Sequence, residues 1–214
     1  MVVPYEISVA EDVLIDTRER IRATRWAEPV AGDEWRYGAS IPYLKDLLDY
    51  WAESYDWRTW EAKLNSQPHF MTTVDGLDLH FWHVRGKKEN SIPLLLLHGW
   101  PGSVIEYFDL LGPLTDPAAH GQPDQPSFDV VLAELPGFGF GGKPAEEGWG
   151  PTRMANALDA LMREKLGYEH YGIHGGDWGT LLGAKIARLH AGPVAALQVS
   201  MPMSQPHSGH TPSP

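Results

Sequence analysis

The chain has no cysteine among its 214 residues, which excludes a disulfide framework and thiolate chemistry. No apolar run approaches the roughly 20 residues that a membrane-spanning helix needs, and no N-terminal segment has the pattern of a signal peptide. Lysine and arginine are also scarce, 17 against 28 acidic residues. The net charge of −11 argues against nucleic acid and anionic membranes as partners. These absences predict a cytoplasmic protein without a transmembrane anchor.

Hydrophobic residues make up 43% of the chain and aromatic residues 11%, enough to bury a sizeable core. Residues 1–66 are predicted to form a leader with amphipathic helices at 11–24 and 41–51, the second behind a Ser40 cap. The leader holds tryptophans at positions 51, 57 and 60. We expect them to pack the leader over the rest of the protein, not to bind a ligand, because large aromatic side chains dominate burial.

From residue 70 the pattern changes to strands that alternate with helices. Asp75-Gly76 predicts a tight hairpin turn between strands 71–74 and 77–84. Further strands are expected at 94–97, 128–135, 170–174 and 194–201, and helices at 104–111, 152–166 and 180–190. A capping box from Ser103 to Glu106 is expected to open the first of these helices. The alternation predicts an α/β fold whose mostly parallel sheet is covered on both faces.

Asp177 is the most informative residue, because it follows an apolar run in His174-Gly-Gly-Asp-Trp-Gly179. This spacing is typical of a nucleophile elbow, in which a strand turns sharply into a helix and exposes the attacking side chain. A helix N-cap is the alternative role, but a cap does not need Gly175 and Gly179 beside it. A carboxylate forms an ordinary alkyl ester with a saturated carbon, so the expected substrates are epoxides or alkyl halides.

A second motif, His98-Gly-Trp-Pro-Gly-Ser103, follows the apolar strand that ends at Leu97. In hydrolases with a nucleophile elbow, the oxyanion hole uses the N–H after the nucleophile and another N–H from the loop after an earlier strand. By position these donors are the backbone N–H groups of Trp178 and Trp100. Each is expected to contribute roughly 3 to 4 kcal/mol while water attacks the ester on Asp177. An ordinary Gly/Pro turn is the alternative, and the order of the two motifs favours the oxyanion loop.

Other segments extend the pattern: Glu134–Phe140 with Lys143-Pro144, and, nearer the N-terminus, Tyr43–Lys45, Tyr50-Trp51, Tyr55–Trp57, Trp60-Glu61, Gly76–Phe81 and His83–Arg85. With the two motifs above, they resemble microsomal-type epoxide hydrolases from about Tyr5 to Met203. The resemblance implies an α/β-hydrolase fold and hydrolysis of a small apolar epoxide to a vicinal diol through an alkyl ester on Asp177. It implies no metal or organic cofactor. The residues that support the motifs are His98, Gly99, Pro101, Gly175, Gly176 and Gly179.

The resemblance also implies a domain plan. Residues 1–110 correspond to an epoxide hydrolase N-terminal region, 67–203 to a partial α/β-hydrolase core with the N-terminal half of the sheet, and 204–214 to a disordered polar tail.

The second half of such an enzyme is expected to be missing. The catalytic acid and histidine follow the nucleophile in hydrolases of this kind, but no Asp or Glu follows Asp177. None of the later histidines, at positions 190, 207 and 210, is expected to activate water, and no tyrosine of a cap domain follows Tyr171. We therefore expect a chain truncated before the cap and the water-activating pair, in which an ester on Asp177 is hydrolysed very slowly.

Two alternative functions stay open. A haloalkane dehalogenase also uses an Asp-Trp elbow, although Trp100 stands where such enzymes often have Asn or Glu, and the long leader is foreign to them. A non-catalytic half-fold would instead pair through its open sheet edge with a second copy or with a separate C-terminal half. The same edge predicts aggregation.

Two further patterns are rejected. Gly137, Gly139 and Gly142 match the dinucleotide fingerprint, but the next helix is expected about ten residues later, too late to meet a phosphate at those glycines. Histidines 80, 83, 98 and 174 do not have the ligand spacing of a metal site.

Overall fold

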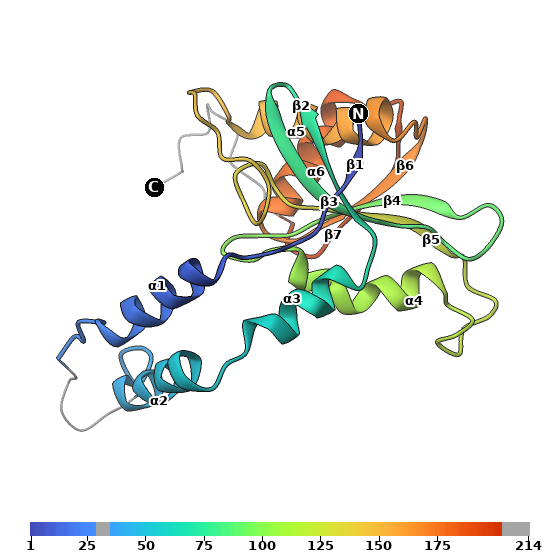
Figure 1. Cartoon of the computed structure of the whole chain (residues 1–214). Coiled ribbons are helices and arrows are strands. Elements are labelled where there is room, and N and C mark those ends of the chain that lie inside the picture. Colours follow the sequence, from blue (N-terminus) through green and yellow to red (C-terminus); the bar gives the residue numbers. More distant parts are fainter. Residues whose placement is uncertain (29–34, 203–214) are drawn as a thin grey trace, which may run out of the picture. The chain divides into compact units, whose positions relative to one another are not determined.

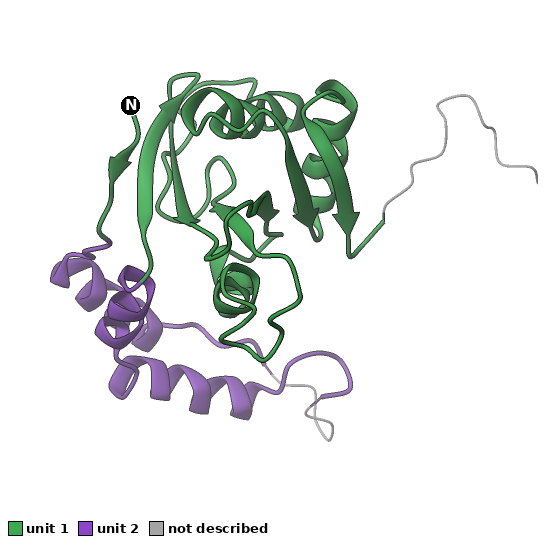
Figure 2. Cartoon of the chain, turned by 90° about the vertical axis from the view of Figure 1, so that its right-hand side faces the viewer, with its two compact units in different colours: residues 1–6, 67–214 green, residues 7–66 purple. Residues whose placement is uncertain are grey.

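The computed structural model describes residues 1–28 and 35–202 (Figure 1). The chain divides into two compact units, which Figure 2 colours separately. Residues 7–66 form one unit, and residues 1–6 with the described residues from 67 onward form the other. In these described ranges no helix is both long enough and apolar enough to cross a membrane. The tail predicted at 204–214 lies outside the described residues.

The leader unit is helical, with α1 at Glu11–Arg22, α2 at Ile41–Glu53 and α3 at Trp57–Asn65. The first two helices and the Ser40 cap confirm the sequence prediction, although the Ser40 hydroxyl accepts the Tyr43 N–H at a long 3.4 Å. The third helix was not predicted. The Asp56 carboxylate caps it by accepting the Arg58 N–H at 2.9 Å. The packing of the leader tryptophans over the other unit stays a prediction.

The second unit is built on one mixed sheet, in the order β1-β2-β3-β5-β4-β6-β7 for the described residues. The strands are β1 Val3–Pro4, β2 His69–Val74, β3 Leu77–Val84, β4 Ile92–Leu97, β5 Phe128–Ala133, β6 Tyr171–Gly175 and β7 Val194–Val199. The first three strands and the β3–β5 pair are antiparallel. Strands β5, β4, β6 and β7 are parallel. The parallel part of the sheet is therefore confined to the strands that alternate with helices, and β1 was not predicted.

Helices connect these strands: η1 Val104–Leu110, α4 Leu111–Thr115, α5 Pro151–Ala160, η2 Leu161–Lys165 and α6 Trp178–Leu189. The segment predicted as one helix at 104–111 is a 3₁₀ helix that passes into the short α4. Its predicted capping box does not form, because the Ser103 hydroxyl accepts the Ile105 N–H at 3.4 Å and not the Glu106 N–H. The tighter 3₁₀ turn brings Ile105 nearer to the cap. The predicted helix 152–166 ends in a π-helical turn, η2.

The β2–β3 hairpin forms as predicted, with both turn residues at positive φ, 49° at Asp75 and 77° at Gly76. The core lies between the sheet and helices α5 and α6, where Leu95, Val131 and Leu158 are completely buried. Each such side chain contributes about 1.5 to 3 kcal/mol. In the sheet register Leu97 pairs with Gly175, so the carboxyl ends of β4 and β6 lie side by side.

Candidate active site

Asp177 lies at the turn from β6 into α6 and has an unusual backbone conformation, with φ at 50° and ψ at −119°. A residue with a side chain adopts such angles at a cost of about 1 to 3 kcal/mol. Its side chain makes no capping hydrogen bond to α6. The N-cap alternative is therefore wrong for the carboxylate, although the Asp177 carbonyl accepts the Thr180 N–H at 3.0 Å.

The motif glycines allow the elbow to press against the end of β4. A Cβ atom on Gly175 would lie 2.4 Å from the Gly179 carbonyl, and one on Gly179 would lie 2.0 Å from the Leu97 carbonyl oxygen. On the facing loop, a Cβ on Gly99 would lie 2.6 Å from the Asp177 Cβ. These distances are too short for any side chain. On Gly176 a Cβ would lie 2.8 Å from the Ser200 hydroxyl.

The loop after β4 contacts the elbow directly. The Trp100 N–H donates to the Asp177 Oδ1 at 2.7 Å, and the Trp100–Pro101 peptide is cis. The Trp178 N–H is the first of α6 and has no hydrogen-bond acceptor among the described residues. Both indole side chains are exposed, 65% for Trp100 and 40% for Trp178. The structure thus brings Trp100 onto the Asp177 carboxylate and leaves the Trp178 N–H unoccupied beside it in the chain.

A buried pair of titratable residues contacts the start of this loop. His98 and Glu134 are 0% and 1% exposed, and the His98 Nε2 lies 3.0 Å from the Glu134 Oε2. The His98 Nδ1 lies 2.9 Å from the Gly99 carbonyl oxygen. Burial lowers the pKa of His98, but the hydrogen bonds that its protonated ring can donate to Glu134 and Gly99, and the negative charges of Glu134 and Glu106, outweigh it. The pKa therefore lies above its ordinary value. The sequence did not reveal this pair.

Tyr107 contacts the other side of the elbow. Its hydroxyl donates to the Leu97 carbonyl at 3.4 Å and accepts a hydrogen bond from the Gly176 N–H. Burial raises the pKa of Tyr107, as does the negative charge of Glu106, while the Gly176 hydrogen bond acts in the opposite direction. This tyrosine was not predicted as a site residue. Its position depends on η1 returning to the sheet, for which the sequence has no local signal.

The histidines that follow Asp177 do not reach it in the described structure. His190 lies at the far end of α6, about 18 Å along the helix at 1.5 Å per residue. There its Nδ1 lies 3.4 Å from the Asp159 carboxylate, and its Nε2 lies 3.0 Å from the Asn156 side-chain oxygen. His207 and His210 are outside the described residues.

The glycines at 137, 139 and 142 do not open a helix. The helix that follows these glycines, α5, begins only at Pro151. Gly139 instead makes room for Glu134, since a Cβ at this position of positive φ would lie 2.1 Å from the Glu134 Oε1. In the described part of the chain no cluster of three or more His, Asp or Glu could hold a metal ion.

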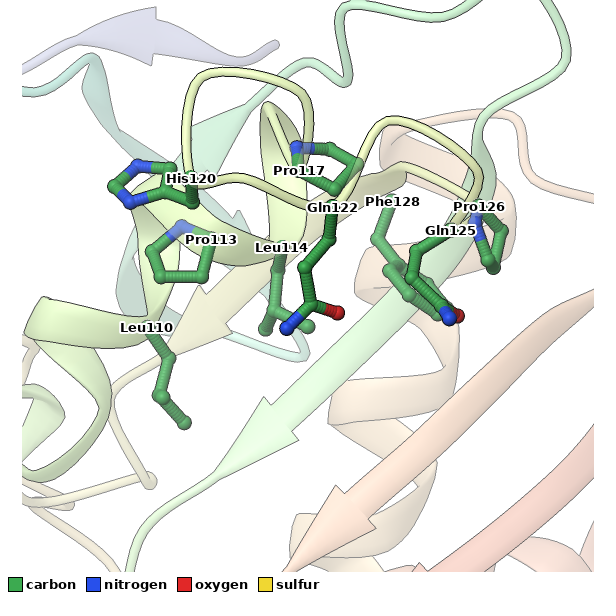
Figure 3. A pocket seen from close by; sticks show the side chains of 9 residues that line it. All are labelled: Leu110, Pro113, Leu114, Pro117, His120, Gln122, Gln125, Pro126 and Phe128. Atoms are coloured by element: carbon green, nitrogen blue, oxygen red, sulfur yellow. The ribbon is translucent and has the colours of Figure 1, made fainter.

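A pocket of about 530 Å³ lies elsewhere in this unit. Figure 3 shows its lining residues, Leu110, Pro113, Leu114, Pro117, His120, Gln122, Gln125, Pro126 and Phe128. Phe128 is the first residue of β5, whereas Asp177 follows the carboxyl end of β6. None of the residues predicted for the site lines this pocket.

Two family models together match residues 2–212 of the chain. Residues 2–107 match the family model of the epoxide hydrolase N terminus, and residues 92–212 match that of the alpha/beta hydrolase fold. A protein of Stigmatella aurantiaca named "Putative epoxide hydrolase" is 43% identical over 205 residues, which are 96% of this chain and 46% of that protein. Epoxide hydrolase 1 of Oryctolagus cuniculus is 35% identical over 202 residues, 92% of this chain and 44% of that protein.

Solved structures agree with the sequence matches. The juvenile hormone epoxide hydrolase of the silkworm Bombyx mori has a TM-score of 0.85 at 33% identity, covering 94% of this chain and 53% of that one. The epoxide hydrolase of Aspergillus niger has a TM-score of 0.82 at 30% identity, covering 97% and 54%. The chain spans about half the length of the curated relatives it matches. It belongs to the alpha/beta hydrolase fold family, and its N-terminal region and the relatives above make it similar to the epoxide hydrolases.

Proposed function

We propose that this chain carries the nucleophilic half of an epoxide hydrolase site, in which Asp177 attacks an epoxide. The observation that carries the proposal is the 2.7 Å hydrogen bond from the Trp100 N–H to the Asp177 Oδ1. One carboxylate oxygen is held by the backbone, and the other is the attacking atom. The strained backbone of Asp177 supports the same role, because such conformations cluster at functional sites.

The first step forms one bond and breaks one. The free Asp177 oxygen attacks an epoxide carbon, the ring C–O bond breaks, and its electron pair stays on the ring oxygen as an alkoxide that takes a proton from water. The product is a hydroxyalkyl ester on Asp177. Hydrolysis then needs water at the ester carbonyl carbon, which places negative charge on the oxygen that Trp100 holds. The Trp178 N–H is the proposed second donor to that charge, because it is unoccupied in the described structure.

The second step is expected to be slow in this chain. His190 lies at the opposite end of α6 and is paired with Asp159. The proposed outcome is an ester that forms and persists.

The test is the intact mass of the purified chain after incubation with a simple aryl epoxide such as styrene oxide. We expect a gain of one epoxide mass, located on Asp177 by peptide mapping, and little diol. Asp177→Ala should abolish the gain. Asp124→Asn should not, because Asp124 is an exposed carboxylate of the loop before β5 and serves as the matched control for unspecific alkylation.

Two results would contradict the proposal. Equal labelling of the Asp177→Ala variant would show that alkylation is unspecific. Diol released over many turnovers and abolished by Asp177→Ala would show that a water-activating base is present after all. Chloride or bromide release from a haloalkane, without reaction with the epoxide, would favour the dehalogenase alternative.

The remaining expectations belong to the same proposal. We propose a small apolar epoxide as substrate, since two residues with exposed indoles adjoin Asp177: Trp178 follows it in the sequence, and the Trp100 N–H donates to its carboxylate. A cytoplasmic location, the absence of a nucleic acid partner and the domain bounds 1–110 and 67–203 stay predictions. Association through the outer edge of β7, with a second copy or with a C-terminal half, is testable by size-exclusion chromatography with and without a separately produced C-terminal half.

A further inference from the structure

The peptide unit between Gly99 and Trp100 is held at both of its polar ends. Its N–H, that of Trp100, donates to the Asp177 Oδ1 at 2.7 Å. Its carbonyl oxygen, that of Gly99, lies 2.9 Å from the His98 Nδ1. The carbonyl and N–H of one trans peptide point in opposite directions, so His98 and Asp177 contact the same planar group from opposite sides.

The contact with the Gly99 carbonyl oxygen determines which ring nitrogen of His98 carries a proton. A carbonyl oxygen can only accept a hydrogen bond, so the Nδ1 that contacts it must carry the proton. Successive hydrogen bonds polarise one another, by about 10 to 30% per bond. A proton donated to the Gly99 oxygen therefore makes the Trp100 N–H a stronger donor toward Asp177.

The other ring nitrogen, Nε2, lies between two groups. It accepts the Leu135 N–H at 3.1 Å, and the Glu134 Oε2 lies 3.0 Å from it. That carboxyl oxygen is buried and has no hydrogen bond in the described structure. A second proton on His98 would make Nε2 a donor, so it would give the Glu134 oxygen a charge-assisted hydrogen bond and could no longer accept the Leu135 N–H. It would also place a positive charge next to the Gly99 carbonyl.

We propose that the buried His98–Glu134 pair positions and polarises the Gly99–Trp100 peptide, and so sets the strength of the hydrogen bond that this peptide donates to Asp177. His98 and Glu134 are positioning residues, since neither contacts Asp177 itself in the described contacts. The inference rests on the proposed function only in treating Asp177 as the nucleophile. Glu106, on η1, is the other charged residue that acts electrostatically on His98. Asp177 is connected to His98 only through the Gly99–Trp100 peptide in the described contacts.

The experiment follows two NMR signals of the ¹⁵N-labelled 214-residue chain through a pH series without substrate: the His98 ring nitrogens and the Trp100 backbone amide. We expect the Trp100 amide to shift with the same midpoint as His98. The step should persist in Asp177→Asn, where no carboxyl at 177 can titrate. A Trp100 amide that ignores the His98 titration in the unaltered chain would overturn the proposal, and this measurement needs no variant to fold.

Glu134→Gln tests the role of the carboxylate. It removes the charge at nearly constant volume and should move both midpoints to lower pH by about 1 to 3 units. Glu134→Asp keeps the charge and should restore part of that shift, whereas Glu106→Gln is the control and should move the midpoints less than Glu134→Gln. If Glu134→Gln lowered only the melting temperature and left both midpoints unchanged, the pair would be merely structural.

These outcomes are separable from the test of function. Failure to form an epoxide adduct would refute the proposed role of Asp177 but would not change the coupling of Trp100 to His98. Loss of that coupling in a chain that still forms the adduct would refute only the present inference.

Discussion

Gly99→Ala perturbs the elbow directly, because it adds one methyl group against the Asp177 side chain. The new Cβ would lie 2.6 Å from the Asp177 Cβ and 2.9 Å from its Oδ1. Ordinary carbon contacts are about 3.5 to 4 Å, so Asp177 must move by roughly 1 Å. Gly99 is not at a positive φ, so the effect comes from the contact and not from the backbone.

The expected loss follows from that displacement. A misplacement of about 1 Å costs a reaction on the order of 10²-fold, or about 2.7 kcal/mol of barrier. The assay is the rate at which the chain gains the mass of styrene oxide. Overpacking alone is expected to lower the free energy of unfolding by about 1 to 3 kcal/mol, so melting curves are needed to show that the variant stays folded at the assay temperature.

Gly192→Ala is the matched control. A Cβ on Gly192 meets nothing within 4 Å, and the residue lies in a turn away from the elbow. It should be alkylated at the unaltered rate. A Gly99→Ala chain that reacts as fast as Gly192→Ala would refute the reasoning that Asp177 is held in a single attacking position against the loop.

Other perturbations have equally defined outcomes. Lowering the pH from 7 to 5 should reduce the free energy of unfolding by about 2 kcal/mol through His80 alone, because burial, and then the neighbouring His69, lower its pKa to about 3 while the unfolded chain titrates near 6.5. The contribution is present above pH 6.5 and is lost on acidification, and urea unfolding of His80→Phe should show a weaker pH dependence. Asp159→Ala leaves the Tyr171 hydroxyl and the Arg163 guanidinium without their buried acceptor and should cost about 3 kcal/mol or more, seen as a lowered melting temperature. Gly179→Ala, with its Cβ 2.0 Å from a backbone oxygen, should lose cooperative unfolding in circular dichroism, unlike Gly192→Ala.

Local patterns were sufficient to predict most of the parallel sheet. Residues 95–97 of β4 and 129–133 of β5 are consecutively buried, and this is why a continuous apolar run and not an alternation marked these strands. The Asp75-Gly76 turn was equally readable, because a tight hairpin needs two residues at positive φ. The elbow was predictable for a similar reason, since its glycines are required by close backbone contacts.

Features that depend on distant contacts were missed. Strand β1 has only two residues and exists because it pairs with β2. Helix α3 does have a local signal, an Asp56 cap followed by apolar Trp57, Trp60 and Leu64, but its tryptophans were interpreted only as packing residues. The His98–Glu134 pair joins residues 36 positions apart, and no spacing rule connects them. The role of a buried charged residue such as Glu134 can be inferred only once the fold shows which residue it contacts.

The strained backbone conformation of Asp177 lowers thermal stability, whereas its carboxylate is the group proposed to react. Glycine adopts φ near 50° without the strain of about 1 to 3 kcal/mol that a side chain brings, so Asp177→Gly relieves the turn while removing the proposed nucleophile. A library of this chain sorted only for survival at high temperature would therefore be enriched in sequences that have lost the carboxylate. Sorting the same library for covalent labelling by an epoxide would instead enrich sequences that keep Asp177.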